Sequence, residues 1–156
     1  MNRFNTLLMG TCLSASLLAA SAAHAMPIQV FDRMSARDQD AYIALLLKGA
    51  EQVLTEAGGS DQAAQVKKFF TTREPGDENT LGMVALELNL SAVRQTDAGN
   101  LVKDPNAKPL PVEFAMIGTL KKIGIILPKI FMHVGDSFQP KDALSPAPQT
   151  VSAKPK

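Results

Sequence analysis

The sequence predicts an all-α fold: a small bundle of about four helices with a short apolar C-terminal element and a disordered tail. Two observations support this fold class. Long stretches carry apolar residues at the three-to-four-residue spacing of a helix, and turns containing glycine or proline separate them. No segment shows the strict alternation of apolar and polar residues that is typical of a half-buried strand. The predicted helices span residues 36–57, 61–71, 77–98 and 111–123.

The first 25 residues have the pattern of a secretory signal peptide. Asn2-Arg3 gives a positively charged start, an uncharged apolar stretch runs from Leu7 to Ala20, and Ala23-His24-Ala25 matches an A-x-A cleavage site. We therefore expect cleavage before Met26 and a periplasmic or secreted protein. The alternative, a membrane anchor, is disfavoured because the apolar stretch is shorter than the roughly 20 residues that span a bilayer.

The composition of the processed chain excludes several classes of protein. Removal of 25 residues from 156 leaves 131, enough for one domain, which we place at 26–138. Cys12, the only cysteine, leaves with the signal, so neither a disulfide nor a thiol nucleophile is expected. Arg3 leaves as well, so 15 of the 16 basic residues remain and balance the 15 acidic ones. This neutrality argues against a nucleic-acid partner, and we expect no stable membrane insertion after cleavage.

The first long helix has clear signals at both ends. Residues 26–34 lack a helical period, so we expect an extended arm there, anchored by a buried Phe31. Ser35 and Asp38 then form a capping-box-like pair, and Gly58-Gly59 can end the helix. Its apolar face comprises Tyr42, Ile43, Leu46, Leu47, Ala50, Val53, Leu54 and Ala57.

The helix predicted at 77–98 is apolar on two sides. Ser60 is expected to cap the shorter helix before it, and Pro75-Gly76 forms the intervening turn. A helix that is apolar on two sides must be covered on both. Gly49 and Gly82 lie inside predicted helices at a cost of roughly 1 kcal/mol each relative to alanine, which suggests close helix contacts there. One apolar side comprises Leu81, Val84, Ala85, Leu88 and Ala92, and the other comprises Met83, Leu86, Leu90 and Val93.

The C-terminal third becomes apolar and then rich in proline. Pro111 suits the first position of the helix at 111–123. Residues 123–134 are the most apolar part of the processed chain and suit either core packing or a binding surface. From residue 139 to 156, prolines among serine, alanine and lysine predict a disordered tail.

Groups able to carry out chemistry are few. His133 is the only histidine left after cleavage, and Asp136 and Ser137 follow it closely. The chain has no G-x-S-x-G nucleophile motif, so we interpret His133 as a partly buried residue near the end of a short helix. Residues 104–115 begin like a calcium loop, but Pro109 replaces the required glycine. We therefore expect no catalytic residue, no metal site and no cofactor.

These patterns favour a non-catalytic binding protein that engages an exported protein partner or a small apolar ligand beside residues 77–98. The alternative at the structural level is that the same residues simply form core. An inhibitor- or immunity-type partner of another exported protein, and a hydrolase that uses His133, are the alternative functions. The expected contact surface comprises Met83, Leu86, Leu90, Val93, Ile126 and Phe131.

Overall fold

The computed structural model describes residues 25–95, 100–103 and 110–146 of the chain. This part is mostly helical, which confirms the predicted all-α class. The elements in chain order are α1 (Ile28–Phe31), α2 (Ala36–Glu56), α3 (Ser60–Phe69), α4 (Leu81–Leu90), β1 (Val93–Gln95), β2 (Leu101–Lys103), α5 (Val112–Lys122) and the 3-10 helix η1 (Lys129–His133).

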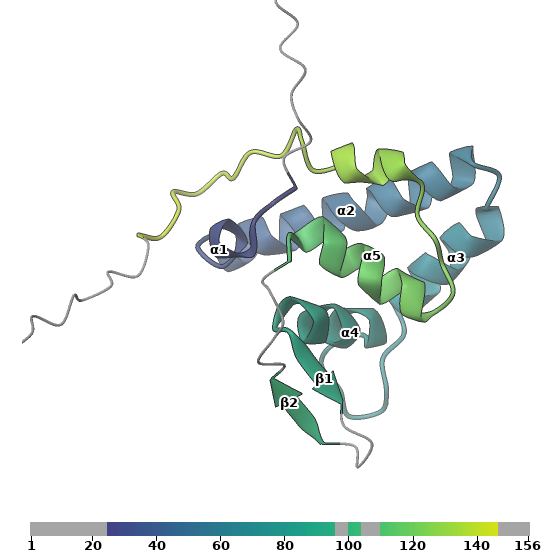
Figure 1. Cartoon of the computed structure of the whole chain (residues 1–156), viewed down its shortest axis with the longest axis horizontal. Helices are drawn as coiled ribbons and strands as arrows, with labels where there is room; N and C mark the ends of the chain where they lie inside the picture. Colours follow the sequence, from purple (N-terminus) through teal and green to yellow (C-terminus); the bar gives the residue numbers. More distant parts are fainter. Residues whose placement is uncertain (1–24, 96–99, 104–109, 147–156) are drawn as a thin grey trace, which may run out of the picture.

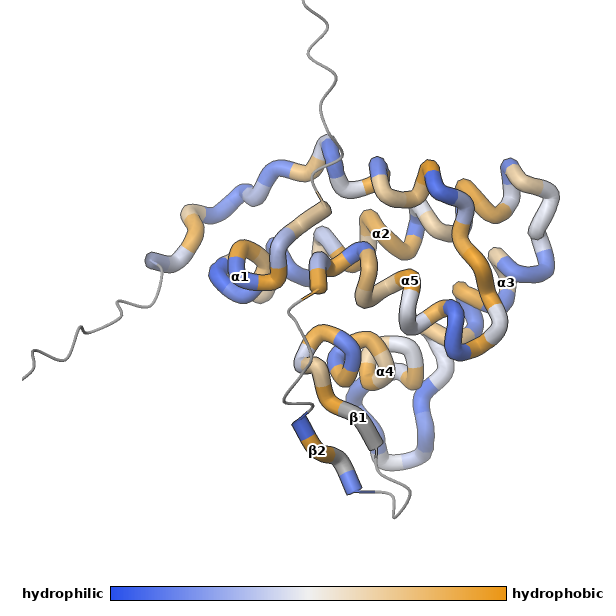
Figure 2. Tube along the Cα trace, viewed as in Figure 1, coloured by the Kyte–Doolittle hydropathy of each residue, from blue (hydrophilic) through white to orange (hydrophobic). Residues whose placement is uncertain are grey.

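Two pairs of helices form the body of the protein (Figure 1). α2 packs against α3, α4 packs against α5, and η1 lies along α2. Apolar residues recur along α2, α4 and α5, whereas α3 is more hydrophilic (Figure 2). Within the described ranges, no helix combines the length and apolarity needed to cross a bilayer.

α2 begins and ends as its local sequence predicts. The Ser35 hydroxyl accepts a hydrogen bond from the Asp38 backbone N–H at 3.2 Å, which satisfies a donor of the first turn. Gly58 has φ +82°, a left-handed conformation that glycine adopts without a steric penalty. The helix between these signals buries most of the predicted apolar face, but Leu47 is only half-buried, and Ala57, which follows the last helical residue, is exposed.

The core lies between α2 and the later helices. α3 contributes Ala63 and Val66, α4 contributes Leu86, and η1 contributes Phe131. Each large apolar side chain buried in this way stabilises the fold by roughly 1.5–3 kcal/mol. Most of the core comes from the buried apolar residues of α2 and α5: Tyr42, Ile43, Leu46, Ala50, Val53, Leu54, Val112, Ala115, Met116 and Leu120. The segments between helices add Met34, Phe70 and Ile125, and α1 adds Phe31.

Two predictions about helix starts are wrong. Residues 26–34 are not an extended arm, because the Pro27 carbonyl accepts from the N–H groups of Val30 at 2.9 Å and Phe31 at 3.1 Å and so closes the turn of α1. Phe31 is nevertheless the buried anchor that we expected. Ser60 is the first residue of α3 rather than its cap, and no side chain caps that helix.

The helix predicted at 77–98 is shorter than expected. α4 begins after Thr80, whose hydroxyl accepts from the Met83 N–H at 3.3 Å, and it ends at Leu90. Ala92 then adopts φ +53°, which directs the chain out of the helix and into an antiparallel pair of strands, β1 and β2. Pairing between strands is not visible in the local apolar period, which explains the wrong prediction. The predicted positions 96–98 lie outside the described residues.

Two helical glycines sit at close contacts, as predicted. A Cβ atom at Gly82 would lie 2.5 Å from the Phe70 ring, and one at Gly49 would lie 2.7 Å from Cγ2 of Val134. Neither neighbour is the far end of a flexible side chain. By contrast, a Cβ at Gly118 in α5 would meet no atom within 4 Å.

These contacts predict opposite signs for three glycine-to-alanine substitutions. Gly49→Ala and Gly82→Ala should each lower the free energy of unfolding by about 1–3 kcal/mol, since overpacking outweighs the gain in helix propensity. Gly118→Ala should raise it by about 0.5–1 kcal/mol. Urea denaturation of the three variants measures this, and an equal effect at all three positions would contradict the packing described.

The segment after η1 is tied back to the start of α2. The Asp142 N–H donates to the Asp38 carboxylate at 2.8 Å, and the Ser35 hydroxyl donates to Asp142 Oδ2 at 2.6 Å. The Ser145 N–H donates to the Arg33 carbonyl at 2.8 Å. Within the predicted tail, residues 142 and 145 therefore contact the start of α2, and residues 147–156 lie outside the described residues.

The pKa of Asp38 gives this tie a pH dependence. The backbone hydrogen bond from Asp142 is the largest cause that holds this pKa below its ordinary value of 3.8. A depressed pKa contributes stability that is present above 3.8 and is lost as the pH falls through the lower folded-state value.

We expect Asp38→Asn to release the 139–146 segment. Trypsin should then cleave after Lys141 several times faster than in the unmodified protein at neutral pH. With an acid-stable protease, the unmodified protein should become more susceptible in this segment as the pH falls through the folded-state pKa of Asp38, and Asp38→Asn should lack this pH dependence. Asp40→Asn, an exposed change on the same helix, should leave cleavage unaltered, and a similar release by both variants would refute the role of Asp38.

Candidate binding groove beside α4

The structure separates the six residues of the predicted contact surface. Leu86 and Phe131 are fully buried and belong to the core, so they cannot form an exposed surface. Met83 and Leu90 are half-buried on one side of α4. Val93 lies at the start of β1, and Ile126, at 75% exposure, lies in the loop before η1.

A groove runs between the start of α2 and one side of α4. Its volume is about 310 Å³, at the lower end of the range for small-molecule sites. Its apolar residues are Met83, Leu86 and Leu90 on one wall and Phe31 and Ile43 on the other. Three uncharged polar residues line it as well: Gln39, Asn79 and Ser91. Three of the six predicted residues therefore line one groove, with Leu86 at its base.

The rim of the groove is acidic. Asp32 and Asp40 border it on one side, and Glu87 borders it on the other. All three carboxylates are exposed, and no lysine, arginine or histidine is among the residues lining this groove. An apolar floor below a negative rim suits an apolar group that carries a positive charge. Within the described residues, no group of three or more possible ligands is placed to hold a metal ion.

A second hollow, of about 390 Å³, lies on the other side of α4. Val84, Leu88 and Val93 line it together with Lys103 of β2. Val84 is 40% exposed, so the hairpin leaves this side of the helix partly open. Glu87 and Ser91 border both hollows, so the two adjoin at the end of α4. The helix that the sequence predicts to be apolar on two sides is therefore buried at Leu86, and each of its two sides opens onto one of these hollows.

His133 is the last residue of η1 and does not line either hollow beside α4. Its Nδ1 atom is 3.0 Å from Asp136 Oδ2, and the His133 side chain is 51% exposed. It borders a separate hollow between α2 and η1, and neither Asp136 nor Glu113 lines this hollow. In the described ranges, no serine hydroxyl is hydrogen-bonded to this imidazole. The two side chains therefore form a hydrogen bond at the end of a short helix, with the imidazole facing solvent.

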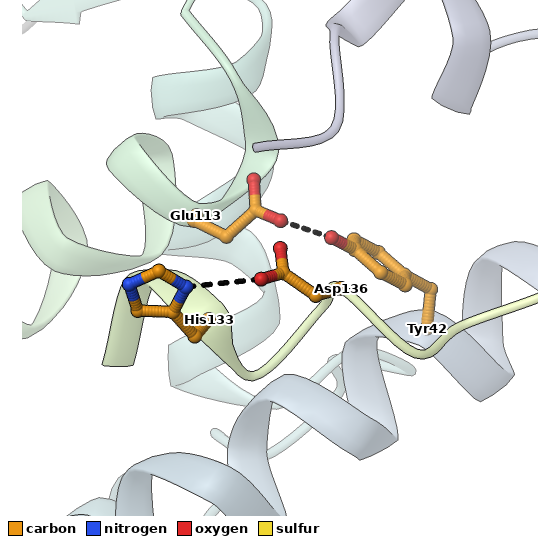
Figure 3. Close-up of polar contacts among 4 residues, drawn as sticks. All are labelled: Tyr42, Glu113, His133 and Asp136. Atoms are coloured by element: carbon orange, nitrogen blue, oxygen red, sulfur yellow. Dashed lines mark hydrogen bonds and ion pairs between the residues drawn. The ribbon is translucent and has the colours of Figure 1, made fainter. Parts of the chain in front are cut away.

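A buried polar pair lies beside His133 and Asp136 (Figure 3). The Tyr42 hydroxyl of α2 donates to Oε1 of Glu113, which is fully buried in the first turn of α5. Gly135 passes so close that a Cβ there would lie 2.7 Å from the same oxygen. Burial first, then the hydrogen bond to Glu113 and the charges of Glu113 and Asp136, raise the pKa of Tyr42. The phenol therefore stays protonated and remains a donor.

Sequence reasoning missed Glu113 and the acidic rim. The carboxylates of the rim come from α1, α2 and α4, which a sequence pattern does not bring together. The burial of Glu113 could have been predicted from the sequence. It lies three residues before Met116 and seven before Leu120, which places it on the apolar side of its helix.

Comparison with models of known protein families, with curated proteins and with solved structures yields no match. The functional assignment therefore depends on the residues of this chain.

Proposed function

We propose that the protein is an exported, non-catalytic binding protein that holds a segment of another exported protein in the groove beside α4. The observation that supports this most directly is the apolar floor of that groove below a rim of three carboxylates. The signal-peptide pattern supports export.

The groove favours one kind of occupant. Its size suits one or two large side chains rather than a ligand that must bury most of its own surface. The acidic rim favours lysine or arginine next to those side chains. A helical or extended segment that pairs leucine or methionine with basic residues meets both requirements.

A matched pair of peptides tests the proposal. The first carries leucine with flanking lysines, and the second carries the same leucines with glutamates. We expect the basic peptide to bind and the acidic one not to bind, with affinity that falls as salt screens the exposed charges. Isothermal titration measures both, and equal binding of the two peptides would refute an electrostatic role of the rim.

Charge reversal locates the site. The double substitution Asp40→Lys with Glu87→Lys should weaken binding of the basic peptide by about tenfold, since exposed pairs contribute roughly 0.2–1 kcal/mol each and reversal adds repulsion. Glu56→Lys makes the same change on α2 outside the groove and should have little effect. Met83→Glu should weaken binding, whereas Ile126→Glu should not, and the opposite result would place the partner at the loop before η1.

A further inference from the structure

The carboxylate of Glu113 is buried without a cationic side chain. Its two oxygens accept from the Tyr42 hydroxyl and from the backbone N–H of Met26, the latter at 2.8 Å. In the ranges that the structure describes, no lysine, arginine or histidine makes a salt bridge with Glu113. Burying a carboxylate is strongly unfavourable unless a cation or several donors compensate it.

The groups that face Glu113 do not supply a full positive charge. Tyr42 reaches it from α2 as a neutral phenol, and Asp136, in the turn after η1, adds negative charge nearby. The start of α5 supplies only the partial positive charge of a helix N-terminus.

Met26 is held firmly at this position. Its carbonyl accepts from the Val112 N–H at 2.9 Å, so both of its backbone polar groups bond to the first turn of α5. Its side chain also packs against the core. The nitrogen that contacts Glu113 is the one that cleavage after Ala25 would release.

We infer that cleavage before Met26 creates the missing cation, and that the new α-ammonium group forms a buried ion pair with Glu113. Water is consumed as the Ala25–Met26 peptide bond breaks: residues 1–25 leave with a carboxylate, and Met26 gains an ammonium group. The signal-peptidase class of hydrolase carries out this reaction. The inference depends on the proposed removal of residues 1–25 and is independent of binding in the groove.

This arrangement couples processing to stability. Before cleavage, the Met26 nitrogen is a neutral amide and can give Glu113 only a hydrogen bond. After cleavage, the same atom carries a full charge beside a carboxylate in a site of low dielectric constant. The processed chain is therefore more stable than the precursor.

Two measurements test this. First, full-length protein is expressed in a bacterial host, and the intact mass of the exported chain is determined; we expect the mass of residues 26–156, and cleavage at another bond overturns the inference. Second, chain 26–156 is compared with chain 25–156, which keeps the same net charge but moves the ammonium group by one residue.

The extra residue should lower the folding equilibrium constant at pH 7 by about tenfold or more, since breaking a buried pair is strongly destabilising. In the Glu113→Gln background, the same extension should change it less than about twofold. If the extra residue lowers the folding equilibrium constant equally in both backgrounds, or in neither, the ion pair is overturned. Cleavage before Met26 is then still supported by the intact mass.

Should Glu113→Gln fail to fold, the pH profile decides. An ion pair raises the pKa of the α-amino group above its ordinary value of about 8. Its contribution is fully present below that value and is lost as the pH rises through the higher folded-state pKa. Chain 26–156 should therefore lose its advantage over chain 25–156 at alkaline pH, and an advantage independent of pH overturns the inference.

Discussion

The buried carboxylate of Glu113 in α5 constrains three other segments that are far apart in the sequence. Tyr42 must approach it from α2, the Met26 backbone from the residues before α1, and Gly135 from the turn after η1. The Tyr42 ring in turn meets the edge of Phe138, with ring centroids 4.8 Å apart. Because an unpartnered carboxylate in the core would be costly, these segments can reach their places only together.

α4 is covered less completely than α2, and this difference separates the core from the candidate site. α4 is joined to α5 by Leu86 in the core and by polar contacts such as Asn89 Nδ2 with the Thr119 hydroxyl at 2.6 Å. The chain then turns out at Ala92 into a hairpin, so Val84 stays partly exposed. The rest of the chain leaves part of this apolar helix exposed. A partner can bury that exposed apolar surface.

Much of the helical fold could be predicted because its signals are local. Ser35, the apolar period of α2 and Gly58 are all read from neighbouring residues, and the structure confirms each of them. The end of α4 could not be predicted, since Ala92 leaves the helix in favour of strand pairing with residues later in the chain. The contact surface was identified only in part, because one apolar period describes both Leu86, which is core, and Met83, which lines the groove.

The same N-terminal residues connect the buried pair to the groove. Met26 is fixed by Glu113 and Val112, and α1 follows two residues later. Phe31 of α1 is buried in the core, lies 6.2 Å from the Tyr42 ring between centroids, and forms part of a groove wall. An ion pair that fixes Met26 therefore also restrains Phe31 in the groove wall and its neighbour Asp32 at the rim. On this basis, the removal of residues 1–25 would both stabilise the fold and pre-organise the site, because the two depend on one short helical turn.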